Sequence, residues 1–247
     1  LGGEMMMEKI MKAVKSGNKK RGRNITVGAV VGMILSCTVA MGTDVSGLDI
    51  TKNGENIEFK DKAGEKFEPG LERDPYLENT WNEVTETYIN NTILSGTSND
   101  SSKGCGISLK GDLGEFKFIN NALITGIATE DSSFGIGILN GGTITILTNN
   151  GSITGTSAKS SNYIISNDYG TIETLTNNGT ITGTSTEGKS YGIDNRDSTG
   201  SITTLINNGT IKGISGKGES YGINNDDGIT ITTLINTGVV YGGTNAI

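Results

Sequence analysis

The chain has 247 residues, and its 38 glycines, 5% aromatic residues and 33% hydrophobic residues are too poor in large apolar side chains for an ordinary globular core of this length. The formal net charge is −7 and there is no histidine, which excludes histidine as a catalytic base or a metal ligand. After residue 42, acidic residues outnumber basic ones by 25 to 13, so we expect no binding to nucleic acid or to anionic lipid.

Residues 1–42 are predicted to form a signal peptide helix that directs export. Residues 1–4 resemble a translated ribosome-binding sequence, so we expect them to be non-native and the true start to be one of the three methionines that follow. Seven Lys and Arg residues then precede the apolar segment Ile25–Gly42, which is the order found in secretory signal peptides. Small residues at its end predict cleavage between Gly42 and Thr43, with a cut near Ala40 as an alternative. A retained membrane anchor is disfavoured because glycine and hydroxyl side chains interrupt the segment.

Residues 43–80 lie outside the repeats and are predicted to form a small β cap. Asn53-Gly54 separates two alternating runs, which is the strongest short-range signal for a β-hairpin. Because an exposed strand edge invites aggregation, we expect the cap to cover the open end of the first coil. Three side chains are expected to pack at the junction of cap and coil: Tyr76, Leu77 and Trp81.

Residues 81–247 are built from one repeated unit. The pattern I-x-x-L-x-N-N-G-x-I-x-G is intact from Ile144, Ile172 and Ile202, and looser copies bring the total to six. Each unit holds about three short β-favouring runs separated by turn-forming residues, and none has a helical apolar period. The glycines that close the copies recur every 28 to 30 residues: Gly96, Gly126, Gly155, Gly183, Gly213 and Gly242. The chain stops at Ile247 in the middle of a repeat, so we expect the repeat region to be truncated.

These repeats predict an all-β fold, a right-handed parallel β-helix of about six coils of about 29 residues. One run cannot bury its own Ile and Leu side chains, whereas stacked units bury them in continuous columns. One column is predicted to contain Leu94, Ile124, Ile153, Ile181, Ile211 and Val240. A second column is predicted to contain Ile107, Ile136, Ile165, Ile193 and Ile223.

The first asparagine of each N-N pair is predicted to form a structural ladder. Stacked amides at one corner can donate to and accept from the neighbouring coils, which satisfies polar groups that are costly to bury unpaired. The ladder consists of Asn90, Asn120, Asn149, Asn177, Asn207 and Asn236. In the last copy Thr237 replaces the second asparagine, so we expect the second position to tolerate other side chains more readily than the first.

The sequence contains no persuasive catalytic motif. Residues 183–190 match a phosphate-binding loop, but a strand rather than the required helix is expected to follow them. Four carboxylates in repeated turns remain as acid-base groups: Asp194, Asp197, Asp226 and Asp227. Solvated turns explain them more simply, and a calcium site at the last two lacks the spacing of a recognised loop. We therefore predict no cofactor and no metal.

The leader ending at Asn24, the cap and the N-N-G-x-I-x-G repeats together resemble the N-terminal passenger of a type V secretion autotransporter. This resemblance implies a β-helix displayed on the surface of a diderm bacterium, held at the outer membrane through a C-terminal β-barrel that is missing from this chain. It also implies an adhesin or stalk, so we predict a non-catalytic protein whose partner is a host or bacterial surface receptor or glycan. The alternative is a carbohydrate-active β-helix enzyme that acts on acidic polysaccharide.

Overall fold

The computed structural model describes residues 47–61, 63, 65–71, 74–99, 103–196, 200–226 and 229–247. The predicted signal peptide with its cleavage site at Gly42 and Thr43 lies outside these residues, as do Asp197 and Asp227. The described residues form twenty β-strands and no helix, so no helix in this part of the chain is available to cross a membrane.

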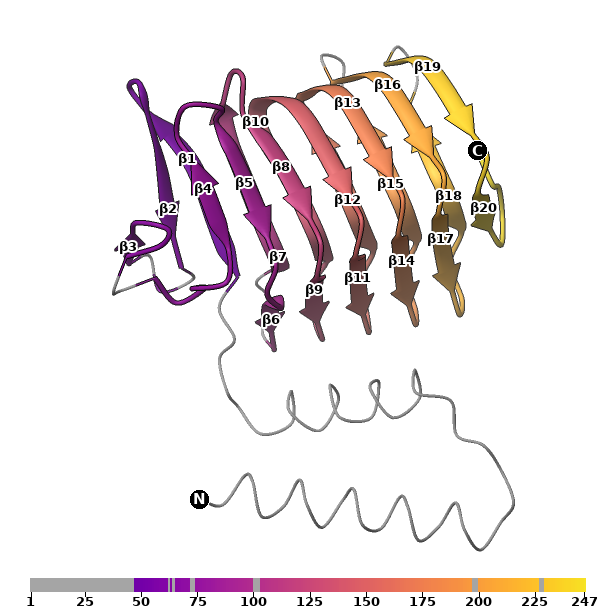
Figure 1. Cartoon of the computed structure of the whole chain (residues 1–247). Helices are drawn as coiled ribbons and strands as arrows, with labels where there is room; N and C mark the ends of the chain where they lie inside the picture. The colour runs from indigo at the N-terminus through magenta and orange to yellow at the C-terminus, as the bar shows by residue number, and fades with distance from the viewer. Residues whose placement is uncertain are drawn as a thin grey trace, which may run out of the picture. The chain divides into compact units, whose positions relative to one another are not determined.

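The repeats form a parallel β-solenoid in which each coil contributes three strands, except the last, which contributes β19 and β20 (Figure 1). The first strands of successive coils are β5 (Thr87–Asn90), β8 (Lys117–Asn120), the second half of β10 (Ser133–Asn149), β13 (Thr171–Asn177), β16 (Ser201–Asn207) and β19 (Thr230–Asn236). The second strands are β6 (Leu94–Ser98), β9 (Leu123–Ala128), β11 (Ser152–Ser157), β14 (Thr180–Ser185), β17 (Thr210–Ser215) and β20 (Val239–Gly242). The third strands are β7 (Gly104–Asp112), the first half of β10, β12 (Asn162–Asp168), β15 (Ser190–Arg196) and β18 (Ser220–Asn225).

The predicted fold and its period are confirmed by the strand register. Each second strand pairs in parallel with the next, so Ile153 lies beside Ile181 and Ile181 beside Ile211. The third strands align Ile165 with Ile193 in the same way. Each second strand thus marks one level, or rung, of the solenoid. The six rungs are separated by about five turns of roughly 29 residues. The second strands form a separate six-stranded sheet, whereas the long strand β10 runs around a corner and joins the first and third strands into one sheet.

The core is a thin stack of aliphatic side chains inside the coil. In β13 the buried residues are Ile172, Leu175 and Asn177, while the side chains between them are exposed or half-buried. Leu175 and Asn177 follow the two-residue period of a strand, Ile172 lies three residues before Leu175, and the Thr and Glu side chains between them stay less buried. Because each coil buries few large side chains, a glycine-rich sequence is sufficient for this fold.

The cap continues the solenoid sheet beyond the first coil. Its strands are β1 (Leu48–Asn53), β2 (Asn56–Lys60), β3 (Lys66–Phe67) and β4 (Thr80–Asn82). Strand β1 pairs in parallel with β7 and in antiparallel with β2, and β2 pairs with β3, so the cap occupies the edge that β7 would otherwise expose. Strand β4 is antiparallel to β5, so among the first strands of the coils the parallel stacking begins with β5 on β8.

Two local predictions for the cap need correction. The hairpin forms, but Asn53 pairs with Asn56, so its central residues are Gly54 and Glu55 rather than Asn53 and Gly54. Gly54 has a φ of 66°, a conformation that glycine adopts without steric cost, and glycine is favoured at the first central position of a type II′ turn. Leu77 does not pack at the junction, because it lies in a surface turn with 67% of its side chain exposed. Tyr76 is buried and Trp81 packs against the core.

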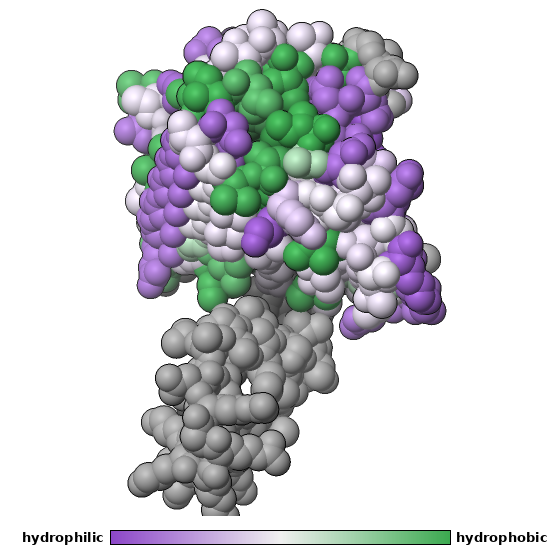
Figure 2. Space-filling model, turned by 90° about the vertical axis from the view of Figure 1, so that its right-hand side faces the viewer, coloured by the Kyte–Doolittle hydropathy of each residue, from purple (hydrophilic) through white to green (hydrophobic). Residues whose placement is uncertain are grey.

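The other end of the solenoid finishes at β19 and β20. The side chains that would face a further rung are exposed there, including Leu234 and Ile235. Figure 2 shows hydrophobic side chains gathered on this end face, bordered by polar side chains.

Candidate functional site

The predicted asparagine ladder is a continuous chain of hydrogen bonds through the buried corner between the first and second strands. Each Nδ2 donates to Oδ1 of the asparagine one coil further along, and the five distances are 2.8, 2.9, 2.8, 2.8 and 2.8 Å from Asn90 to Asn236. The first five side chains are 0% exposed. Nδ2 of Asn149 also donates to the carbonyl of Thr180 (3.2 Å), so the amide satisfies backbone groups where the chain turns. The ladder therefore stabilises the coil and is not positioned to contact a ligand.

Two further asparagine ladders were missed in the sequence. The second residue of each N-N pair forms an exposed ladder whose amides donate in the opposite direction, from Asn208 to Asn178 (2.9 Å) and from Asn178 to Asn150 (2.9 Å). A third ladder runs through Asn167, Asn195 and Asn225 with distances of 2.7 and 2.7 Å. The signal for the third was available, since these asparagines recur at intervals of 28 and 30 residues.

Four aromatic rings are stacked on the outer face of the third strands. The rings of Phe134, Tyr163, Tyr191 and Tyr221 lie with centroids 5.3, 5.1 and 5.3 Å apart and with interplanar angles of 19°, 4° and 6°. The spacing follows from the distance between parallel strands, because one ring comes from each coil. We call these four residues the aromatic column.

A charged cluster lies beside the aromatic column. The guanidinium carbon of Arg196 is 4.5 Å from the ring centroid of Tyr163, and the same guanidinium pairs with Asp168 (3.7 Å) and Asp194 (3.5 Å). Only 2% of Asp194 is exposed, and this burial raises its pKa to about 6, although the hydrogen bond from Asn224 and the charge of Arg196 oppose the shift. Asp194 Oδ2 has no hydrogen-bond partner among the described residues and only the ion pair with Arg196.

The structure brings together two of the four carboxylates that were considered for acid-base chemistry. Nδ2 of Asn224 donates to Oδ1 of Asp194 (2.8 Å) and to Oδ1 of Asp226 (2.9 Å), so an amide stands between the two acids. Among the described residues no group of three His, Cys, Asp or Glu side chains is arranged to hold a metal ion. The segment that matches a phosphate-binding loop connects β14 to β15, two strands of the solenoid, and a helix N-terminus does not follow it.

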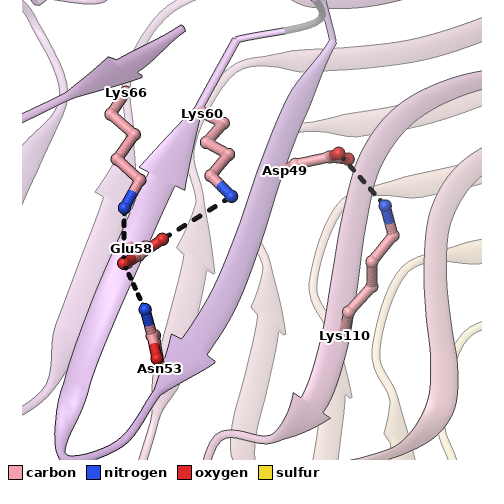
Figure 3. Close-up of polar contacts among 6 residues, drawn as sticks. All are labelled: Asp49, Asn53, Glu58, Lys60, Lys66 and Lys110. Atoms are coloured by element: carbon pink, nitrogen blue, oxygen red, sulfur yellow. Dashed lines mark hydrogen bonds and ion pairs between the residues drawn. The ribbon is translucent and has the colours of Figure 1, made fainter. Parts of the chain in front are cut away.

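A groove of about 840 Å³ lies in the cap, and the sequence analysis did not predict it. It is lined by β2, β3 and the residues around Trp81, and we call it the cap groove. One wall carries Glu58, which accepts hydrogen bonds from Lys66 (2.7 Å) and Asn53 (2.9 Å) and lies 3.6 Å from Lys60 (Figure 3). These donors lower the pKa of Glu58 to about 2, chiefly through the hydrogen bond from Lys66.

The cap groove is held in place by contacts on both sides. Asn53 belongs to β1, Lys60 to β2 and Lys66 to β3, so Glu58 links the three strands of the hairpin region. A second ion pair joins Asp49 of β1 to Lys110 of β7 (3.1 Å) and connects the cap to the first coil (Figure 3). Beneath the groove the ring of Phe59 contacts those of Trp81 and Tyr88, each with centroids 5.2 Å apart.

The comparisons with known proteins add no family to this description. No protein-family model, curated protein or solved structure matches the chain.

Proposed function

We propose that the mature chain is a non-catalytic, surface-displayed passenger that acts in bacterial attachment, either as an adhesin or as a stalk that carries a binding region. The observation that supports this most is the unbroken stack of six rungs, in which one buried asparagine ladder and the aliphatic columns continue from coil to coil. Each added rung extends such a stack by about 4.8 Å without requiring a larger core. A long stack can hold a binding region away from the cell, which serves attachment, whereas turnover of a small substrate does not require such length.

The outer surface suits many weak contacts. Thr, Ser and Asn side chains recur at the same positions in successive coils, so any group they bind meets equivalent sites at regular spacing. Several weak contacts made at once hold two surfaces far more tightly than any one of them. The partner we propose is a receptor or glycan on a host or bacterial surface, and the acidic balance of the chain disfavours nucleic acid.

The export route is part of the same proposal. The basic and apolar leader supports secretion, and its resemblance to autotransporter leaders supports display on the outer membrane.

A carbohydrate-active enzyme is the second candidate, and one observation favours it. Asp194 has a pKa raised to about 6 by burial, and a carboxyl group near neutrality is suited to general acid-base catalysis. Against this, Arg196 and Asn224 occupy the space around its two oxygens, so a substrate must first displace them.

Two assays on the purified full chain test the proposal. Binding to host cells, partner bacteria and immobilised glycans is the expected result, with heat-unfolded protein as the control. Release of unsaturated sugars from acidic polysaccharides, with and without calcium, tests the enzyme. Turnover that disappears in Asp194→Asn or Asp226→Asn would overturn the non-catalytic assignment.

A further inference from the structure

The cap groove combines an aromatic platform with carboxylates that form no ion pair with the described residues. Phe59 and Phe67 are almost fully buried, whereas Trp81 is only partly buried and Leu71 is 55% exposed, so these two side chains offer the apolar contact area. The carboxylates of Glu68 and Glu83 also line the groove, and both residues are exposed. A volume of about 840 Å³ is within the range of small-ligand sites.

Trp81 is pre-positioned for binding. Its ring packs edge-on against Phe59 at 5.2 Å and lies 5.9 Å from the ring of Phe116, which is fully buried in the first coil. A ring held by neighbouring rings loses little conformational entropy when a ligand packs on it. The platform is therefore rigid before any ligand arrives.

The charges in the groove select against anionic ligands. Glu58 is compensated by Lys60 and Lys66, whereas Glu68 and Glu83 make no ion pair with any described residue. The described lining residues include three glutamates and one lysine, so these side chains carry a net negative charge and present carboxylate oxygens that accept hydrogen bonds. Its partner must supply donors without negative charge, together with an apolar face for Trp81.

A sugar ring matches this combination, because its C–H face packs on an aromatic ring while its hydroxyl groups donate from the edge. We propose that the cap groove binds a neutral oligosaccharide, with Trp81 as the stacking platform and with Glu68 and Glu83 as hydroxyl acceptors. The inference rests on the proposed attachment function and names its ligand class. The groove is lined by residues of β2 and β3, which lie at the opposite end of the solenoid from β19 and β20 (Figure 1). A stalk attached through the β19 and β20 end would hold the groove away from its point of attachment.

The chain itself supplies the probe, since Trp81 is its single tryptophan. The full chain is titrated with uncharged hexasaccharides of glucose, mannose and N-acetylglucosamine while tryptophan emission is recorded. At least one is expected to give a saturable change in intensity or wavelength, and hexagalacturonate is expected to bind at least about tenfold more weakly. No saturable change up to about 10 mM of any neutral sugar, or tighter binding of hexagalacturonate, would overturn the proposal. Saturation by an uncharged peptide but by none of the sugars would overturn it in favour of a peptide site.

Three variants separate binding from folding. Glu83→Gln keeps the size of an exposed side chain and is expected to weaken the sugar about three- to tenfold. Glu78→Gln is the matched control, because Glu78 is also exposed and is not among the residues that line the groove, and the variant should bind as the unmodified chain does. Trp81→Phe keeps an aromatic ring against Phe59, and its sugar affinity is expected to fall about tenfold by calorimetry at a temperature where thermal unfolding shows the variant to be folded. Equal affinities of Glu83→Gln and Glu78→Gln would overturn the assigned role of Glu83.

The two proposals fail separately. Attachment to cells without sugar binding would remove the groove site and leave the attachment function. Sugar binding without attachment to any tested surface would leave the groove site and remove the attachment function.

Discussion

Replacing Asn177 with alanine tests whether the buried ladder stabilises the solenoid. Asn177 is 0% exposed, accepts a hydrogen bond from Asn149 (2.8 Å) and donates to Asn207 (2.8 Å). Its Nδ2 also donates over longer distances to the carbonyls of Gly179 (3.3 Å) and Thr210 (3.2 Å). Losing the two short ladder hydrogen bonds costs about 2 kcal/mol, and leaving Oδ1 of Asn207 without its donor costs about 1 to 3 kcal/mol more. We therefore expect the free energy of unfolding to fall by about 3 to 5 kcal/mol in Asn177→Ala.

The neighbouring residue provides the control. Asn178 has the same chemistry and two hydrogen bonds of 2.9 Å, but it lies in the exposed ladder where water replaces lost partners. Asn178→Ala should cost at most about 1 kcal/mol. Urea unfolding of both variants measures the difference, and thermal melting should show a loss of roughly 10 °C for Asn177→Ala alone. Equal destabilisation by the two substitutions would refute the reasoning that burial sets the strength of the ladder.

Three further predictions concern the acid cluster, the packed glycines and export. Asp194→Asn should raise the free energy of unfolding at pH 7 by up to about 3 kcal/mol and leave it unchanged near pH 4. The pKa of Asp194 is raised from 3.8 to about 6, so its protonated carboxyl contributes to stability at low pH, and this contribution is lost as the pH rises through 6. Equal effects in urea unfolding at both pH values would contradict this. Gly126→Ala should destabilise the coil strongly, since its Cβ would lie 1.9 Å from the carbonyl oxygen of Phe134, whereas Gly137→Ala meets nothing closer than 3.6 Å and should melt near the unmodified temperature. Edman sequencing of the surface protein should begin at Thr43, and an intact leader there would disprove cleavage.

For the aromatic column, the sequence predicts the stacking of the rings but not the charged side chain that lies against them. The recurrence of Phe134, Tyr163, Tyr191 and Tyr221 at one repeat length indicates that the rings share a column. It does not indicate that Arg196 lies against the ring of Tyr163. Arg196 and Tyr163 belong to neighbouring coils, so whether their side chains meet depends on how one coil is placed over the next.

The cap illustrates a different limit. The Asn-Gly signal correctly predicted a hairpin, but the turn formed one residue later, with Asn53 paired to Asn56 and Gly54 in the positive-φ position. Leu77 was expected to be buried from its hydrophobicity, yet the turn that contains it faces solvent. In a segment without repeats, no second copy of the pattern is available to check such a prediction.

The sequence by itself determined the β-solenoid, its period, its aliphatic columns and the residues of the buried ladder, because a parallel coil places residues one period apart directly above one another. The spacing of Ile153, Ile181 and Ile211 alone therefore aligns them, and their strands pair in that register. Only the tertiary structure decided that Glu58 joins three cap strands, that Trp81 borders an open groove, and that Arg196 and Asn224 surround Asp194. These arrangements depend on side-chain direction and on contacts between non-repeating segments, which a one-dimensional period does not contain.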